Sequence, residues 1–440
     1  MNLKRNWKSF TRKHKSDSIY ISEISVGKKT MRFSFARREI TFLVVLLFFS
    51  FIVRVLFFPF PGCKGDLGAF AWWFNTAATY GPRVFYNVVS WVDYPPFNIY
   101  IFWVFGSIAK GLSLFGSPLI AYIIKLPPTI FDLATSILIF FFVRKRSDLK
   151  MALVATATYA LNPAVIFNSA IWGQFDAIYT FFLILSLLLI FESRPKLVAV
   201  AFMLGILTKP QSIALAPLMV FLIFRKYNWR GLITSIGAAI VTVFVVILPL
   251  EWTNGNPVTF LSDIYFGAYK TYAYTSVNAF NIWGFGGMWK PDTQIFLFTN
   301  VYVIGWMMFG ALVAFTLYFV YKRLGVSEEL VILFSAFLLF FGFFMLPTRI
   351  HERYLFPAFS VMALLIPFVR KMRPVYAVLS GTYLINQAYV LSFINANSYI
   401  PDGDPVVLII SLINLVVFLY VLVLTWRGLG NYNWLRMRAH

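Results

Sequence analysis

The chain has 440 residues, of which 60% are hydrophobic and 20% aromatic, while only 12% carry a charge. Soluble domains carry about 25% charged residues, and runs of about twenty apolar residues recur along this sequence. The composition therefore excludes an ordinary soluble domain and predicts an all-α polytopic membrane protein. The single cysteine, Cys63, excludes an internal disulfide framework. The net charge of +21 fits basic cytoplasmic loops, so we expect no nucleic-acid partner.

The chain opens with a basic segment, 1–39, which lacks the short apolar core of a cleavable signal peptide. We expect it to lie in the cytoplasm and to attract anionic lipid headgroups. A transmembrane domain at 40–426 and a cytoplasmic tail at 427–440 follow. The domain contains twelve apolar segments, at about 40–60, 118–143, 151–171, 175–191, 197–207, 212–224, 231–250, 294–321, 330–347, 354–369, 374–394 and 406–426.

A shorter apolar stretch, 97–113, decides the topology, because every later segment would change sides if it crossed the membrane. Lys110 and several Gly and Ser residues interrupt it. Treating it as non-spanning places 28 of the 38 Lys and Arg residues on the cytoplasmic side. This bias predicts cytoplasmic termini, a second large external loop at 251–293, and one long first external loop, 61–117, in which 97–113 forms an interfacial helix.

Two neighbouring segments are too short to span. At about 1.5 Å per residue, 197–207 extends only about 16 Å, roughly half of the hydrocarbon core. The sequence TKPQ (208–211) separates it from the short segment 212–224. Such a break must line a cavity or be covered by protein. Lys209 lies at the break and is a functional candidate, although a lysine there could also simply cap carbonyl groups at a helix end.

The topology gathers polar residues from separate loops on the external side: Asp66, Arg83, Asp93, Gln174, Asp176, Arg349, His351, Glu352 and Arg353. There is no P-loop, GxSxG or HExxH motif, and three histidines cannot build a His-rich metal site, so neither a metal nor a cofactor is expected. Carboxylates, cations and aromatic rings suit transfer to a hydroxyl, in which a carboxylate accepts the proton and cations hold an anionic leaving group. An activated sugar outside the cytoplasm would be carried on a lipid phosphate.

The sequence resembles the GT-C superfamily of polyprenyl-phosphate-sugar-dependent glycosyltransferases. GDLGAF, with Asp66, is similar to the acidic start of that family's first external loop, and DYPPF (93–97) resembles the DYPP of dolichyl-phosphate-glucose glucosyltransferases of N-glycan assembly. Four further stretches resemble other motifs of the superfamily, including its mannosyltransferases and its prokaryotic and archaeal members: LNPAVIFNSAIWGQFDAIYTFFLIL (161–185), LTKPQSIALAPL (207–218), VNAFNIWG (277–284) and IHERYLFP (350–357).

The resemblance implies a GT-C fold with about twelve transmembrane segments and an inverting transfer of a hexose. Mannose is favoured and glucose comes next, moving from a polyprenyl or dolichyl phosphate to a hydroxyl of a lipid-linked glycan or glycolipid. It implies Asp66 as the general base, for which one carboxylate suffices. It also implies donor-phosphate contacts from His351 and Arg353, with added charge from Arg349 and Lys209. Implied substrate-binding residues are Asp93, Tyr94, Gln174, Asp176, Glu352 and Trp283.

The sequence departs from two branches of that superfamily. Leu67 follows Asp66, so the Asp-Glu pair of protein O-mannosyltransferases is missing. The WWD signature and the metal-binding DxD motif of oligosaccharyltransferases are also missing, which favours a metal-free reaction. The membrane would be the cell membrane of a prokaryote or the ER membrane of a eukaryote. The alternative is a multi-pass transporter or lipid flippase, which would share the broken helices and Lys209.

Overall fold

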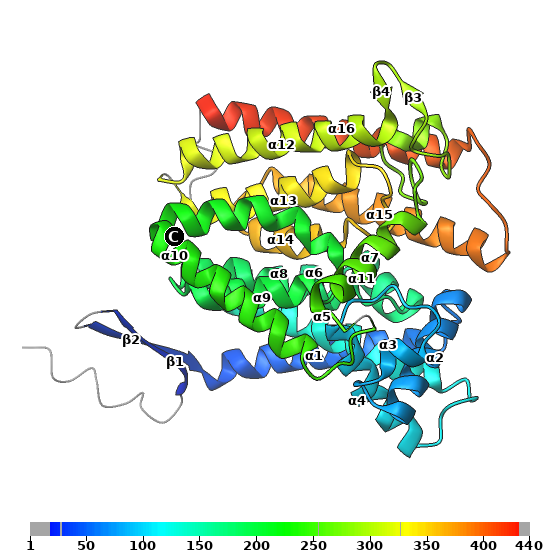
Figure 1. Cartoon of the computed structure of the whole chain (residues 1–440). Helices are drawn as coiled ribbons and strands as arrows, with labels where there is room; N and C mark the ends of the chain where they lie inside the picture. The colour runs from blue at the N-terminus through cyan, green and yellow to red at the C-terminus, as the bar shows by residue number, and fades with distance from the viewer. Residues whose placement is uncertain (1–17, 27–28, 254, 326, 431–440) are drawn as a thin grey trace, which may run out of the picture.

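The computed structural model describes residues 18–26, 29–253, 255–325 and 327–430, and most of them are helical (Figure 1). Within the described part of the basic segment, β1 (Ser18–Val26) and β2 (Lys29–Ala36) pair as an antiparallel hairpin that leads into α1 (Arg37–Phe57). The predicted tail at 427–440 is described only to Gly430, where α16 (Pro405–Gly430) ends.

Seven helices of the described residues are long and apolar enough to cross a membrane. An eighth span results if a pair of helices bent by 41°, at Leu149–Ala160 and Pro163–Trp172, crosses as one. The all-α polytopic prediction is therefore confirmed. The seven are Arg37–Phe57 (α1), Ile120–Arg144 (α5), Pro210–Ile247 (η2 and α10), Val301–Arg323 (α12), Glu328–Met345 (α13), Met372–Asn395 (α15) and Pro405–Gly430 (α16).

The twelve predicted segments are all largely helical, but they are not twelve full-length spans. Segments 212–224 and 231–250 lie largely on two helices within α10 (Ala216–Ile247), and a kink at Asn228, where φ is 57° and ψ is −166°, separates them. Three others are short apolar helices: α8 (Asp176–Phe191), α9 (Pro195–Ile206) and α14 (Phe356–Leu365). Every residue of α14 is buried, as is every residue from Leu330 to Met345 in α13, so these helices form the core of the bundle.

A second difference lies at the segment predicted over 294–321. Its helix, α12, begins only at Val301, and the apolar residues before it form a small hairpin of β3 (Ile295–Phe296) and β4 (Thr299–Asn300). Asn300 starts the helix by accepting a hydrogen bond from the Val303 amide at 2.9 Å. Hydropathy does not distinguish an apolar hairpin from the first turns of an apolar helix, so the predicted boundary was wrong.

The predicted first external loop folds into α2 (Lys64–Tyr80), α3 (Phe85–Val88) and α4 (Phe97–Gly111), which lie together at one end of the bundle (Figure 1). The predicted helix over 97–113 is α4. Its 15 residues extend about 22 Å, too little to cross the hydrocarbon core. A Cβ at Gly106 of α4 would lie 2.2 Å from the Phe74 carbonyl oxygen, so glycine allows α4 to pack directly on α2.

The chain between α6 (Leu149–Ala160) and α8 is bent by a proline and a π-helical turn. Asn162 caps α7 (Pro163–Ile166), and the helix then widens into η1 (Phe167–Trp172). Gly173 ends this turn at φ 89°, a conformation that favours glycine. Short π-helical segments frequently mark functional sites because they redirect the side chains that follow.

The predicted second external loop contains α11 (Pro257–Thr271) and η3 (Ile282–Gly286). After α11, this loop pairs with the segment that joins α13 to α14. The Val277 amide donates to the Ile350 carbonyl at 2.9 Å, and the Arg349 amide donates to the Tyr274 carbonyl at 2.9 Å. These bonds fix the start of the IHER sequence against the chain that follows α11.

Candidate active site

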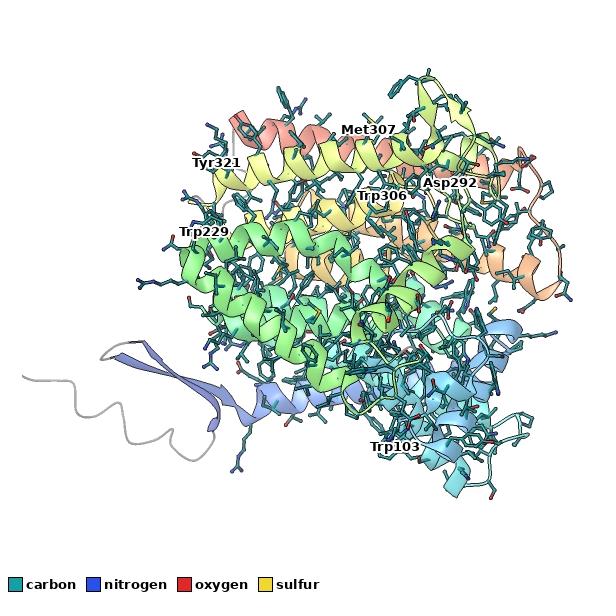
Figure 2. All side chains as sticks on the ribbon, viewed as in Figure 1. Trp103, Trp229, Asp292, Trp306, Met307 and Tyr321 are labelled. Carbon is teal, nitrogen blue, oxygen red and sulfur yellow. The ribbon has the colours of Figure 1, made fainter. Side chains whose placement is uncertain are left out.

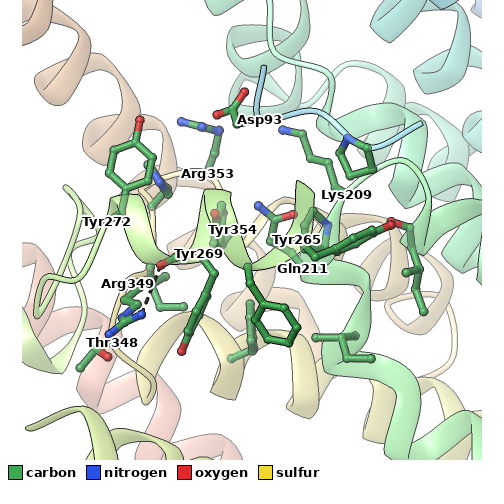
Figure 3. Close-up of a pocket in the computed structure, with 18 of the residues that line it drawn as sticks. Asp93, Lys209, Gln211, Tyr265, Tyr269, Tyr272, Thr348, Arg349, Arg353 and Tyr354 are labelled. Atoms are coloured by element: carbon green, nitrogen blue, oxygen red, sulfur yellow. Dashed lines mark hydrogen bonds between the residues drawn. The ribbon is translucent and has the colours of Figure 1, made fainter. Parts of the chain in front are cut away.

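A cavity of about 480 Å³ lies where the loop before α4, the break before η2, α11 and the segment after α13 meet (Figure 3). These four regions are far apart in the sequence. Six of the predicted site residues line the cavity: Asp93, Tyr94, Lys209, Arg349, His351 and Arg353. The structure therefore brings the predicted cationic residues Lys209, Arg349 and Arg353 to one cavity, together with His351.

Lys209 reaches this cavity because α9 ends at Ile206 and the chain is extended at Lys209 before η2 (Pro210–Leu215). Its ammonium group donates to Asp176 Oδ1 at 2.8 Å and to Gln174 Oε1 at 3.4 Å. Those partners are side chains, so Lys209 is not the simple carbonyl cap that the sequence left open. Asp176 is fully buried, and its pairing with Lys209 offsets the cost of burying both charges.

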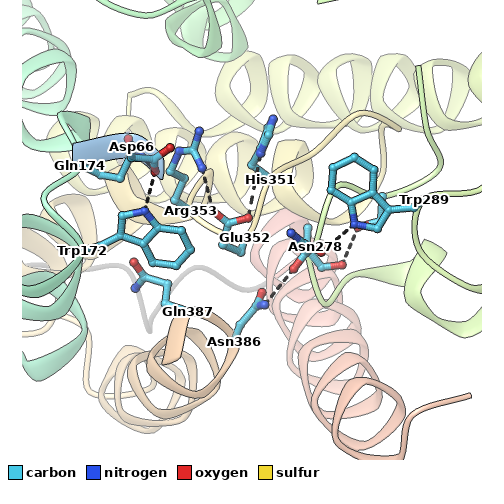
Figure 4. A network of polar contacts seen from close by, with 12 residues as sticks. Asp66, Trp172, Gln174, Asn278, Trp289, His351, Glu352, Arg353, Asn386 and Gln387 are labelled. Atoms are coloured by element: carbon cyan, nitrogen blue, oxygen red, sulfur yellow. Dashed lines mark hydrogen bonds and ion pairs between the residues drawn. The ribbon is translucent and has the colours of Figure 1, made fainter. Parts of the chain in front are cut away.

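Asp66 lies in the first turn of α2 and is only partly buried. Its Oδ2 accepts hydrogen bonds from Trp172 Nε1 at 2.7 Å and from Gln174 Nε2 at 2.5 Å (Figure 4). Both donors lie at the end of the π-helical turn, so the turn places their side chains next to the Asp66 carboxylate. Burial, and then the charge of Asp66, raise the pKa of the neighbouring Cys63 thiol to about 12, so this thiol stays protonated.

Gln174 connects Asp66 to the cavity. Its Oε1 accepts hydrogen bonds from Tyr94 at 3.2 Å and from Lys209 at 3.4 Å, and both of these residues line the cavity. Asp66 itself does not line it. The carboxylate therefore lies one hydrogen-bonded side chain behind the cavity wall, and Figure 4 shows Arg353 between Asp66 and Glu352.

Arg353 and Glu352 form a buried pair next to His351. Arg353 Nη1 donates to Glu352 Oε1 at 2.7 Å, and 18% of the Arg353 side chain remains exposed, against 1% for Glu352. Burial raises the pKa of the Glu352 carboxyl, an effect that the charge of Arg353 opposes. Burial, followed by the charges of Arg353 and Lys209, lowers the pKa of His351 well below its usual value. His351 is therefore neutral at pH 7 and can donate one hydrogen bond into the cavity.

Arg349 is held differently from Arg353. Its Nε and Nη2 donate to the two carboxylate oxygens of Asp292 at 2.7 and 3.2 Å, and Thr348 donates to the same carboxylate at 3.0 Å. The guanidinium also stacks on the rings of Tyr269 and Tyr302, 4.4 and 4.7 Å from their centroids. Its charge is thus met by protein, and its backbone is fixed at φ 65°.

Asp93 lies between Arg353 and Lys209 in Figure 3. Its Oδ1 is buried and has no hydrogen-bond partner in the protein. Burial raises the pKa of this carboxyl, while the charges of Arg353 and Lys209 act in the opposite direction. A buried polar atom without a partner, facing a cavity, is expected where a ligand completes the hydrogen bonding.

The other predicted residues take supporting places or lie elsewhere. Gln174, Asp176 and Glu352 are at most 1% exposed and stand behind the cavity wall. Trp283 does not line the cavity, because its indole N–H donates to the Leu346 carbonyl at 2.8 Å on another side of the α13 end.

Sequence reasoning missed the aromatic wall of the cavity. Tyr265, Tyr269 and Tyr272 line it from α11 and its end, and the rings of Tyr272 and His351 are 4.9 Å apart. Their i, i+4, i+7 spacing was visible in the sequence and places them on one face of a helix. Within the described residues, no three His, Cys, Asp or Glu side chains are grouped so that they could hold a metal ion.

The polar cavity continues into an apolar groove of about 720 Å³ between α10 and α12. Ile213 and Trp306 line both spaces. The remaining groove residues are Ala214, Ala216, Pro217, Val220, Phe221, Phe224, Trp229, Leu232, Phe309 and Leu317. A molecule with a charged head and a long apolar tail could place both parts here without leaving the protein surface.

No protein-family model matches the chain, and no curated protein matches it. Among solved structures, the chain is similar to the Archaeoglobus fulgidus oligosaccharyltransferase, crystallised with a tethered acceptor peptide that contains the NVT sequon. The two sequences are 15% identical, and the TM-score is 0.38. The match covers 89% of this chain and 55% of the archaeal enzyme, so this chain spans about half the length of that protein. A similarity this loose carries no argument about activity.

Proposed function

We propose that this chain is a GT-C-type glycosyltransferase that uses a polyprenyl or dolichyl phosphate sugar as its donor. The observation that carries the proposal is the joining of two spaces: a cavity with Arg353, Lys209 and His351 on its wall, and an apolar groove that begins at Ile213 and Trp306. Cations suit a lipid phosphate, and the groove suits its isoprenoid tail.

The proposed chemistry depends on Asp66, which accepts hydrogen bonds from Trp172 and Gln174 and is partly exposed. An acceptor hydroxyl approaching the exposed side of Asp66 would give its proton to the carboxylate as its oxygen attacks the anomeric carbon. The bond between that carbon and the phosphate oxygen breaks, and the lipid phosphate leaves with its charge held by Arg353 and Lys209. Trp172 and Gln174 orient the carboxylate. A single displacement of this kind inverts the anomeric carbon.

The finer assignments belong to the same proposal. The sugar would be a hexose, with mannose favoured and glucose next, and the acceptor a lipid-linked glycan or glycolipid. Asp93, with its unpartnered Oδ1, would bind a sugar hydroxyl. Arg349 is assigned to holding the IHER segment, because Asp292 already neutralises its charge. The cavity would face away from the cytoplasm, with both termini inside.

The test uses detergent-purified protein, labelled lipid-phosphate hexoses and candidate lipid-linked acceptors. The wild-type protein is expected to make product, and Asp66→Asn to lose roughly 10²–10⁴-fold in rate. Asp93→Asn is the matched control, with a smaller loss that appears mainly in the KM for donor. An unchanged rate for Asp66→Asn would show that another group is the base. Product made without a sealed membrane would exclude pure transport, the alternative that the broken helices leave open.

A further inference from the structure

The hairpin before α12 exposes an unusual apolar surface. Ile295, Phe296, Leu297 and Phe298 follow one another in the chain, and their exposed fractions are 83%, 51%, 76% and 73%. No other residue in the part of the chain that the structure describes covers them. Four consecutive large apolar side chains on an open surface mark an interaction site in a folded protein.

The turn of this hairpin is chemically unfavourable for a turn that faces water. Leu297 and Phe298 occupy the two turn positions, and Leu297 has φ 60°. Asn and Gly are preferred there because they tolerate positive φ, whereas leucine is strained. Leu297 and Phe298 therefore do not stabilise the turn itself. Their apolar side chains would stabilise the hairpin only through contact with an apolar partner outside the chain.

The position of the hairpin identifies that contact as lipid. It leads directly into α12, a candidate membrane span that starts at Val301. In Figure 1 the hairpin projects sideways, across the direction of α12, so its tip stays near the depth at which α12 enters the membrane. Met307 and Met308, further along α12, are 55% and 40% exposed on its outer surface (Figure 2). The hairpin is thus continuous with a lipid-facing helix.

Charge supports the same occupant. No charged residue occurs in the sequence from Thr293 to Tyr321, which includes the hairpin and nearly all of α12. A protein-binding surface of this size normally has a polar rim. An uncharged apolar tip beside a spanning helix is suited to the acyl region just below the headgroups.

We propose that the Ile295–Phe298 tip inserts into the membrane leaflet on the cavity side and anchors the rim of the cavity there. The base of the hairpin is tied to the cavity wall through Asp292 (Figure 2). The Tyr302 amide donates to the Asp292 carbonyl at 3.0 Å, and the buried Asp292 carboxylate binds Arg349, which lines the cavity. The tip thus fixes the level of the cavity mouth relative to the lipid.

The test measures the depth of the tip directly. Leu297→Cys is labelled with an environment-sensitive fluorophore and reconstituted into vesicles whose phospholipids carry bromine near the headgroup end of the acyl chains. Native Cys63 is only 3% exposed, and wild-type protein treated with the same fluorophore reports any labelling of it. Ala396→Cys, at an exposed position in the loop between α15 and α16, is the matched control. Phe298→Cys is a second label site in case the first perturbs the turn.

The proposal expects brominated lipid to quench the label at 297 or 298 at least threefold more than at 396, and aqueous iodide to quench in the reverse order. Equal iodide quenching at all three positions would overturn it, because the tip would then lie in water. Resistance of the tip label to both quenchers, together with cross-linking between copies, would also overturn it and assign the surface to a second copy of the chain.

Discussion

Two of the buried arginine–carboxylate pairs in this protein have different surroundings. Arg54 and Asp132 lie in α1 and α5, and both side chains are 0% exposed. Arg54 also donates to the Ala160 carbonyl at 2.6 Å, and Tyr159 donates to Asp132 at 2.9 Å, so protein groups enclose this pair. Arg353 pairs with Glu352 but keeps 18% of its side chain exposed, in the cavity.

The comparison teaches that a buried charge in a membrane protein is a functional candidate only when it opens onto a space. Two lysines show the same contrast. The Lys125 ammonium group donates to the Phe58 and Phe60 carbonyls at 2.9 and 2.7 Å and caps the end of α1. Lys209 binds side chains and lines the cavity. Both lysines lie among apolar segments, and the sequence singles out Lys209 only by its place at the break, so their contacts are what establish the difference.

The largest effect is expected from breaking the enclosed pair. Arg54→Met leaves the Asp132 carboxylate buried without its cation, which typically costs about 3–5 kcal/mol. Thermal unfolding in detergent should show a much lower midpoint, with the specific activity of the remaining folded protein unchanged. The double variant Arg54→Met with Asp132→Leu should recover much of the loss, because no buried charge remains. A single variant as stable as wild type would mean that water or lipid headgroups reach Asp132.

A change in the Arg353–Glu352 pair, which is open to the cavity, should lower the rate of the proposed transfer. Arg353→Gln removes the cation proposed to hold the leaving phosphate and should lower the rate by about 10²–10³-fold, the usual cost of losing one group that stabilises developing charge. Arg353→Lys retains the charge and should recover part of the rate. Initial rates against lipid-donor concentration measure both. If Arg353→Gln lowered only the thermal midpoint, this pair would be structural like the first.

Much of the fold followed from local sequence patterns. The apolar segments, the break at 208–211 and the helix over 97–113 each depend on hydropathy or on proline within a short window, and the structure contains all three. The π-helical turn at 167–172 was not predicted, whereas the kink at Asn228 falls in the break that separates the predicted segments 212–224 and 231–250.

The residues of the candidate site were easier to predict than the ion pairs that they form. Lys209, His351 and Arg353 reach the cavity as a set that the order of motifs suggested. That Asp292 would neutralise Arg349 could not be read from the chain, because the two residues are 57 positions apart and belong to different loops. Trp283 was selected from a motif, and a motif does not state which side of a helix end its indole faces.

A smaller effect should appear in the pH dependence of stability. Because the pKa of His351 is lowered in the folded protein, the unfolded chain takes up a proton below about pH 6.5 that the folded chain does not. The free energy of unfolding should therefore fall as the pH falls. Asp93 and Glu352, with raised pKa values, act in the opposite sense.

The comparison of wild type with His351→Gln isolates the histidine, since both proteins keep the two carboxyl groups. Between pH 7.5 and 5.5 the stability difference between them should change by about 1 kcal/mol in favour of the variant at the lower pH. Unfolding midpoints across this range in one detergent measure it. Parallel curves would show that folding leaves the pKa of His351 unchanged, and a change in favour of wild type at the lower pH would show that His351 is held protonated and belongs with the cations.

The smallest effect is expected at another ion pair, which is neither enclosed by protein nor part of the cavity lining. Arg83 Nε lies 3.0 Å from Glu251 Oε1, but the two side chains are 75% and 40% exposed, so water screens their attraction. The backbone also joins these residues, since the Glu251 amide donates to the Arg83 carbonyl at 2.7 Å. Arg83→Ala retains that bond and should change stability by less than about 1 kcal/mol and leave the KM for donor unchanged. Arg83 was among the external polar residues that the sequence gathered, and a raised KM for donor in this variant would place it in the site despite its distance from the lining residues.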